Sequence, residues 1–92
     1  DVLDLPQDAT PVDFAYAVHS YVGDHACGAK IDGVMRKLDF KLSNGEVVEI
    51  LINKNQRGPN ADWLKFTKSA SAKDKIRSYI NKLKKTNSFI LR

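Results

Sequence analysis

Three observations in the amino-acid sequence predict a small α+β domain followed by a helical extension. A short strand-like segment leads directly into strong helix-start signals. Alternating apolar segments, separated by glycines and an Asn-Gly turn, come next and favour strands. Beyond residue 53 the chain becomes basic and its apolar spacing becomes helical. With 92 residues, the chain can bury one compact core.

The first part of the chain predicts one strand and then one helix. Residues 2–5 alternate imperfectly and end at a proline, which is typical of a short strand entering a turn. Thr10 as the N-cap, Pro11 at the first helical position and Asp13 in the first turn predict a helix that ends at Gly23. The apolar stripe that we expect this helix to bury comprises Phe14, Ala15, Val18, Tyr21 and Val22.

The middle of the chain predicts further strands. Residues 28–33 have the composition of a short strand between glycines, and residues 38–42 alternate with a period of two. The Asn44-Gly45 turn leads into residues 46–52, the most strand-like segment, which we expect to be a central strand. Strand, helix and further strands, with the helix packed on one face of a mixed sheet, describe a β-grasp (ubiquitin-like) fold.

The charge distribution divides the chain near residue 53. Residues 1–53 hold nine acids and four bases, a net charge of −5, whereas residues 54–92 hold eleven bases and two acids, a net charge of +9. The turn-like composition of residues 54–61 lies at this change of sign. We therefore expect a β-grasp domain over 1–53, a linker over 54–61 and a basic helical extension over 62–92.

Two helices are predicted in the extension, a short one over residues 62–66 and a longer one after it. The longer helix begins with a capping-box-like pairing of Ser71 and Asp74. Its apolar stripe, which needs a packing partner, comprises Ala72, Ile76, Tyr79, Ile80 and Leu83.

Several classes of function lack support in the sequence. Cys27 is the single cysteine, so no internal disulfide forms, and Asp24, His25 and Cys27 together do not make a metal site. No apolar run is long enough to cross a membrane, and a cytoplasmic protein is expected. Neither a phosphate-binding loop nor a nucleophile or metalloprotease motif occurs, and we expect no catalysis and no cofactor.

Four stretches of the chain form a more specific pattern. They are Leu5-Pro6 through Thr10 to Ser20, Val22-Gly23 with Gly28-Ala29-Lys30, Leu38 through Asn44-Gly45 to Leu51, and Gly58-Pro59-Asn60 with Asp62-Trp63-Leu64 and Lys75-Ile76-Arg77. Together they span residues 5–77 and resemble the TGS domain of RelA/SpoT-type (p)ppGpp synthetases and hydrolases. The first and third stretches are the most specific.

The resemblance implies a non-catalytic regulatory domain of a GTP pyrophosphokinase or (p)ppGpp hydrolase of the stringent response, because the chemistry of that family lies in upstream domains. Family members open with a strand and hairpin before the part that matches this chain, so we expect the first strand to be missing before Asp1. TGS domains of ribosome-associated members contact the 3′ CCA end of an uncharged tRNA through the helix that here contains His19.

His19 is the leading candidate for that contact. On the predicted helix it falls away from the apolar stripe and next to Tyr16, so packing does not explain it. An exposed imidazole beside an aromatic ring can hydrogen-bond to an unpaired base or stack on it. The alternative is a surface histidine that caps the helix or bonds locally.

Basic residues could neutralise the phosphates near such an RNA end. Lys30, Arg36 and Lys37 belong to the strand region, and Lys54 and Arg57 follow the last predicted strand. The alternative is that these side chains serve solubility alone.

Two functions of different classes stay open at this stage. The first is a sensor of the uncharged tRNA 3′ end on the ribosome, which would reject a charged tRNA because a closed pocket has no room for the esterified amino acid. The second is a protein-interaction or autoregulatory module that binds the catalytic domains of the same chain or acyl carrier protein. That module would use the apolar and basic surface of residues 62–85.

Overall fold

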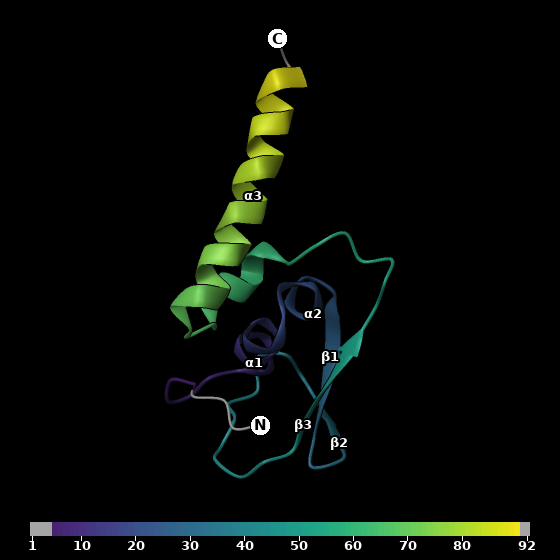
Figure 1. The fold of residues 1–92 in the computed structure, drawn as a ribbon, viewed down its shortest axis with the longest axis vertical. Helices are drawn as coiled ribbons and strands as arrows, with labels where there is room; N and C mark the ends of the chain where they lie inside the picture. The colour runs from purple at the N-terminus through teal and green to yellow at the C-terminus, as the bar shows by residue number, and fades with distance from the viewer. Residues whose placement is uncertain (1–4, 91–92) are drawn as a thin grey trace.

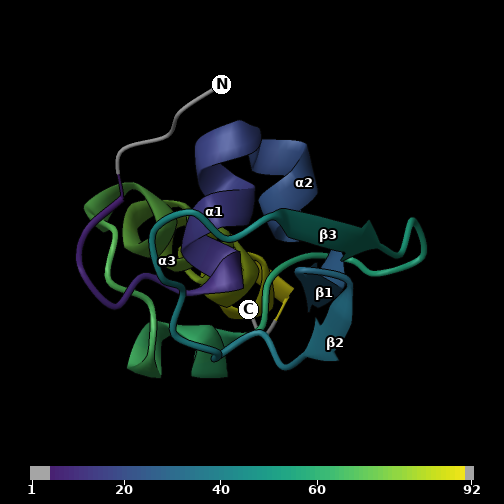
Figure 2. The same ribbon diagram turned by 90° about the horizontal axis from the view of Figure 1, so that it is seen from below.

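The computed structural model describes residues 5–90, with side chains described through residue 82, and has an α+β fold (Figure 1). Its elements in chain order are α1 (Pro11–Val18), α2 (Ser20–Asp24), β1 (Ala26–Ile31), β2 (Val34–Arg36), β3 (Val48–Ile52), the 3₁₀ helix η1 (Ala61–Lys65) and α3 (Ala70–Ile90). Helices α1 and α3 lie on the same side of the sheet (Figure 2). The predicted α+β class is confirmed, and so are the short and the long helix of the extension.

The described sheet has the order β2-β1-β3, so β1 is its central strand. Both pairings are antiparallel, and Ala29 lies opposite Arg36 on one side and Ile50 on the other. The prediction of a central strand over residues 46–52 is therefore wrong for this sheet, in which β3 lies at the edge. No parallel pair occurs among the described strands. The strand predicted over 2–5 lies outside the described residues, except for Leu5, which is not in a strand.

A tight turn at Asp32 and Gly33 joins β1 to β2. Both residues have positive φ, 51° and 83°, as a two-residue hairpin turn requires. The strand that follows β1 is therefore β2, directly after this turn. Residues 38–42 are not in a strand, so the prediction of a strand there is wrong. The Leu42 amide instead donates to the carbonyl of Ala9 at 2.8 Å, which ties this segment to the turn before α1.

The single helix predicted from Thr10 to Gly23 is two helices that are separated at His19. The His19 backbone is extended, with φ −170° and ψ 148°, and this interrupts the helix. Gly23 does not end the second helix, which continues to Asp24. The prediction of the start, with Pro11 at the first position, is confirmed.

The break changes which side chains are buried. Ala15 is fully buried, and Phe14 and Val22 are partly buried. Val18 and Tyr21, however, are exposed, contrary to the predicted stripe. A helical wheel that continues through His19 places them on the wrong side, since α2 does not share the axis and phase of α1.

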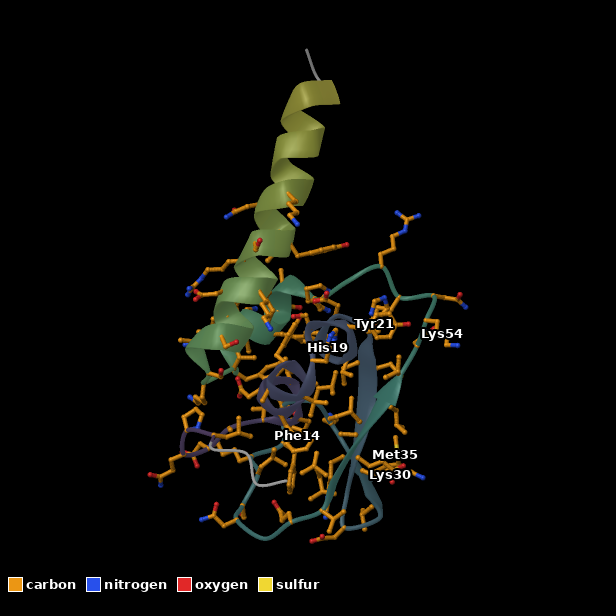
Figure 3. All side chains as sticks on the ribbon, in the orientation of Figure 1. Phe14, His19, Tyr21, Lys30, Met35 and Lys54 are labelled. Carbon is orange, nitrogen blue, oxygen red and sulfur yellow. The ribbon has the colours of Figure 1, made fainter. Side chains whose placement is uncertain are left out.

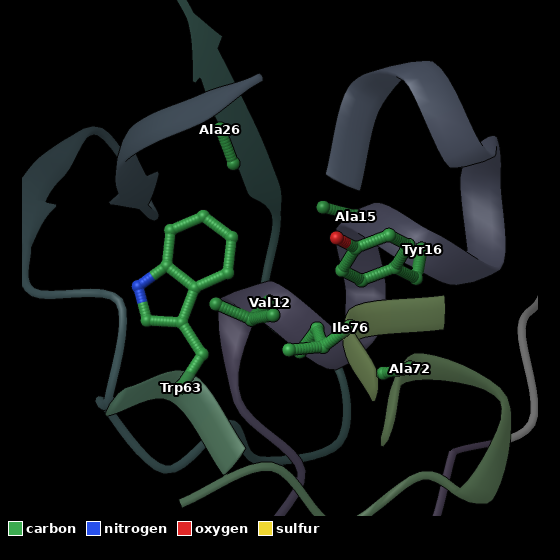
Figure 4. Packing of buried hydrophobic residues seen from close by; sticks show 7 residues of the cluster. All are labelled: Val12, Ala15, Tyr16, Ala26, Trp63, Ala72 and Ile76. Carbon is green, nitrogen blue, oxygen red and sulfur yellow. The ribbon is translucent and has the colours of Figure 1, made fainter. Parts of the chain in front are cut away.

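One core joins α1, β1, η1 and α3 (Figure 4). Its members are Val12, Ala15, Tyr16, Ala26, Trp63, Ala72 and Ile76. The stripe predicted for the long helix thus packs against α1, and Ala72 and Ile76 are fully buried. The side chain of Leu83 lies outside those that the structure describes. Residues on both sides of the predicted boundary at residue 53 share this core.

The buried carboxylate of Asp13 connects α1 to the start of α3. It accepts hydrogen bonds from the amide and hydroxyl of Thr10 at 2.8 and 3.0 Å, and from the amides of Lys68 and Ser69 at 3.0 and 2.9 Å. It is fully buried. Ser69 Oγ also accepts an amide of the first turn of α3, so Ser69, rather than the predicted Ser71, precedes this helix.

Candidate functional site

His19 occupies the break between α1 and α2 with its side chain exposed (Figure 3). Its Nδ1 accepts a hydrogen bond from the Tyr21 amide at 3.0 Å and thereby caps α2. An imidazole nitrogen that accepts from an amide carries no proton, so the neutral ring holds its proton on Nε2. The local capping bond predicted as the alternative therefore forms, and it leaves an N–H donor on the outer edge of the ring.

Tyr16 does not lie beside His19 on the surface, so the helix face that the sequence predicts, with Tyr16 and His19 together as the RNA contact, does not form. Tyr16 is only 2% exposed, and its hydroxyl donates to Asp24 Oδ1 at 2.8 Å. Burial, together with the Asp24 carboxylate, raises the pKa of the Tyr16 phenol far above its usual range. The ring also covers Gly23, where an added Cβ would come within 2.3 Å of it. Tyr16 is thus a core residue that fixes α2 on α1.

The aromatic ring next to His19 is that of Tyr21. It stacks on the His25 ring with centroids 4.2 Å apart and an interplanar angle of 28°. The His25 Nδ1 lies 2.9 Å from the Tyr21 carbonyl oxygen. Sequence reasoning placed Tyr21 in the core and considered His25 only as a metal ligand. The spacing of four residues on a helix is the signal that could have paired them.

The loop after β3 is fixed beside this stack. The Asn53 amide donates to the His25 carbonyl at 2.9 Å. Gln56 Nε2 lies 3.1 Å from the carbonyls of Asp24 and Ala26, at the junction of α2 and β1. Both bases of this loop, Lys54 and Arg57, are exposed, and Lys54 directly follows Asn53, whose amide bonds to His25. The structure therefore brings this loop and its two predicted site residues to the His19 end of the domain.

The other predicted bases lie elsewhere. Lys30 pairs with Met35 across β1 and β2, and the two side chains lie at the opposite end of the domain from His19 (Figure 3). Because side chains alternate along a strand, Arg36 belongs to the other face from Lys30. The Arg36 guanidinium lies 5.2 Å from the centre of the Phe40 ring. Lys37 is exposed just after β2. These three residues do not converge with His19.

Two further features concern the described residues alone. Among them, no three His, Cys, Asp or Glu side chains form a group that could hold a metal ion. None of their helices combines the length and apolar character needed to cross a bilayer.

The fold and the matched sequence define the class of protein. The family model of the TGS domain matches residues 1–52, more than half of the chain. This chain therefore belongs to the TGS domain family, and its three-stranded sheet with packed helices is consistent with the β-grasp-like fold expected for that family.

Named relatives show in which kind of protein a domain like this one occurs. The chain is 45% identical to a GTP pyrophosphokinase of Myxococcus xanthus over 91 residues, which are 99% of this chain and 12% of the relative. It is 49% identical to the bifunctional (p)ppGpp synthase/hydrolase RelA of Mycobacterium tuberculosis over 83 residues, 89% of this chain and 11% of the relative. A guanosine-3′,5′-bis(diphosphate) 3′-pyrophosphohydrolase of Aquifex aeolicus is 43% identical over 82 residues, 89% of this chain and 12% of the relative.

The resemblance to RelA/SpoT-type enzymes is thus confirmed, and the region shared with these relatives includes the TGS domain. The chain spans only about a tenth of the length of these relatives.

Proposed function

We propose that this chain is the regulatory TGS domain of a cytoplasmic (p)ppGpp synthetase/hydrolase and that it senses the 3′ CCA end of an uncharged tRNA on the ribosome. The observation that carries the proposal is the exposed His19 ring at the helix break, held by its bond to the Tyr21 amide. A ring fixed in one orientation presents its Nε2–H to a ligand without first losing rotational freedom.

The chemistry of this arrangement suits the end of an RNA strand. Unpaired nucleotides offer hydroxyl, carbonyl and ring-nitrogen acceptors to an imidazole donor. Lys54 and Arg57, on the loop that is bonded to the His25 segment, supply positive charge for the phosphates. Lys30, Arg36 and Lys37 belong to the β1–β2 region and are not joined to His19 by any contact that the structure describes, and we propose that they meet another part of the RNA.

Substitution of His19 tests the proposal. We expect His19→Ala to weaken binding of a short oligoribonucleotide that ends in CCA by about tenfold, because one hydrogen bond to a fixed donor is lost. His19→Asn is the matched control, since asparagine also caps a helix but carries no imidazole. Affinities would be measured by fluorescence anisotropy at one stated salt concentration.

Both variants should lose affinity, while His19→Asn keeps the melting temperature of the parent chain. Wild-type affinity in both variants would refute the role of His19. Wild-type affinity in His19→Asn alone would assign the effect to the helix cap and not to the imidazole.

A protein-binding or autoregulatory function is the second candidate, and the exposed bases in and before α3 favour it. Lys68, just before α3, and Arg77 and Lys82 within it are exposed and could meet an acidic partner such as acyl carrier protein, or the catalytic domains of the same chain. The apolar side of α3 is less available than the sequence predicts, because Ala72 and Ile76 are buried in the domain's own core. A saturable complex that forms without RNA and maps to these bases would favour this candidate.

A further inference from the structure

The stacked rings of Tyr21 and His25 are not part of the core cluster. Tyr21 is 45% exposed although His25 covers one of its faces. The part of an aromatic ring that stays exposed to water adds little to the stability of the fold. Its exposed surface is available to a flat ligand.

Both histidines are oriented by the backbone of Tyr21. Its amide donates to His19 Nδ1 at 3.0 Å, and its carbonyl lies 2.9 Å from His25 Nδ1. Since a carbonyl only accepts, His25 Nδ1 must carry a proton, and in the neutral ring Nε2 is then an acceptor. The neutral His19 ring has the opposite arrangement, with its donor on Nε2. The backbone of one residue therefore orients a donor imidazole, His19, and an acceptor imidazole, His25, and the His25 ring stacks on the exposed ring of that residue.

The charge around the stack indicates the class of ligand. Residues 53–60, which pass beside His25, include the two bases Lys54 and Arg57 and no acid. The nearby acid Asp24 already accepts the Tyr16 hydroxyl. An aromatic platform with basic side chains next to it is the arrangement that binds single-stranded nucleic acid, in which bases stack and phosphates meet cations.

We propose that the Tyr21–His25 stack is a platform for one unpaired nucleobase, next to the nucleotide that His19 contacts. This inference rests on the proposed function and extends it by adding a second subsite, with the base on Tyr21 and its phosphate near Lys54. The platform is pre-formed, because the hydrogen bonds to the Tyr21 backbone and the bond between Asn53 and His25 hold it without a ligand.

The test uses the oligoribonucleotide ACCA and two variants of Tyr21. Tyr21→Leu keeps an apolar side chain and all backbone bonds but removes the ring, and it should raise the Kd about tenfold. Tyr21→Phe keeps the ring and should bind within about twofold of the parent chain, since stacking needs no hydroxyl. Val18→Ala, at another exposed apolar residue just before the helix break, is the control and should change nothing.

Abasic versions of the probe identify the base. For one position of ACCA, removing the base should weaken binding to the parent chain about tenfold and leave binding to Tyr21→Leu unchanged, because the stacking partner is already gone. Additive losses at every position would overturn the platform.

The outcomes separate this inference from the proposed function. If Tyr21→Leu binds like the parent chain while His19→Ala does not, the platform is wrong and the tRNA-end function stands. If the parent chain does not bind ACCA at all, both proposals are wrong.

Discussion

Replacing Asp13 by alanine is expected to lower the free energy of unfolding by about 4 kcal/mol, which is most of the stability of a domain this small. The carboxylate is fully buried and accepts from Thr10, Lys68 and Ser69. Alanine would leave three amides and a hydroxyl without acceptors, and each buried unsatisfied group costs about 1–3 kcal/mol. Urea denaturation followed by Trp63 fluorescence would measure the change.

Asp74→Ala is the matched control for Asp13→Ala. Asp74 is also an acid near a helix start, but its ion pair with Arg77, at 3.7 Å, lies on the surface. Its loss should change the stability by no more than about 0.5 kcal/mol. If Asp13→Ala lost less than about 1 kcal/mol, the carboxylate would not be the connection between α1 and α3 that its hydrogen bonds indicate.

Replacing Ile76 by alanine is expected to cost about 3 kcal/mol, because the side chain is fully buried between α3 and α1 and would leave a cavity. Ile76→Val removes one methylene and should cost about 1 kcal/mol. Amide hydrogen exchange would show where the stability is lost, and we expect the first turns of α3 to lose protection most.

Val47→Ala serves as the apolar control for Ile76, since Val47 is 69% exposed and its truncation should be nearly neutral. A fully stable Ile76→Ala variant would contradict the shared core. The basic extension would then be an independent unit, as the change of charge sign near residue 53 suggests on its own.

Local chemistry explains what the sequence predicts well. The start of α1 depends on Thr10, Pro11 and Asp13, which are neighbours in the chain. The turn at Asn44-Gly45 and the helical spacing of Ala72 and Ile76 are also local patterns, and the structure contains the turn and the helix.

The remaining features depend on contacts that a linear pattern does not contain. Tyr16 is buried because Ile76, sixty residues later, belongs to the same core. The helix breaks where His19 bonds to the Tyr21 amide, a choice between two local hydrogen-bond patterns that helix periodicity does not decide. The hairpin turn at Asp32-Gly33 could have been predicted from the sequence, because this dipeptide favours a two-residue turn.

The candidate site also combines features that local sequence predicts with features that depend on contacts in the fold. The motif around His19 predicts a contact site on this helix, and the structure leaves the His19 ring exposed. Its neighbour Tyr21 becomes a surface residue only because the helix breaks, so a continuous helical wheel hides it. His25 lies beyond the predicted helix, where the sequence suggests only a metal ligand. Lys54 joins them through the bonds of Asn53 and Gln56, which are contacts between the loop and α2 that the sequence does not reveal.

The measurement that tests the proposed function most directly compares the affinity of this chain for one tRNA in its deacylated and aminoacylated forms at the same salt concentration. A sensor of the uncharged 3′ end should prefer deacylated tRNA by at least about tenfold, because an esterified amino acid would clash with the contacts to the terminal ribose. His19→Asn should lose this preference. Equal binding of both forms by the parent chain would contradict the account.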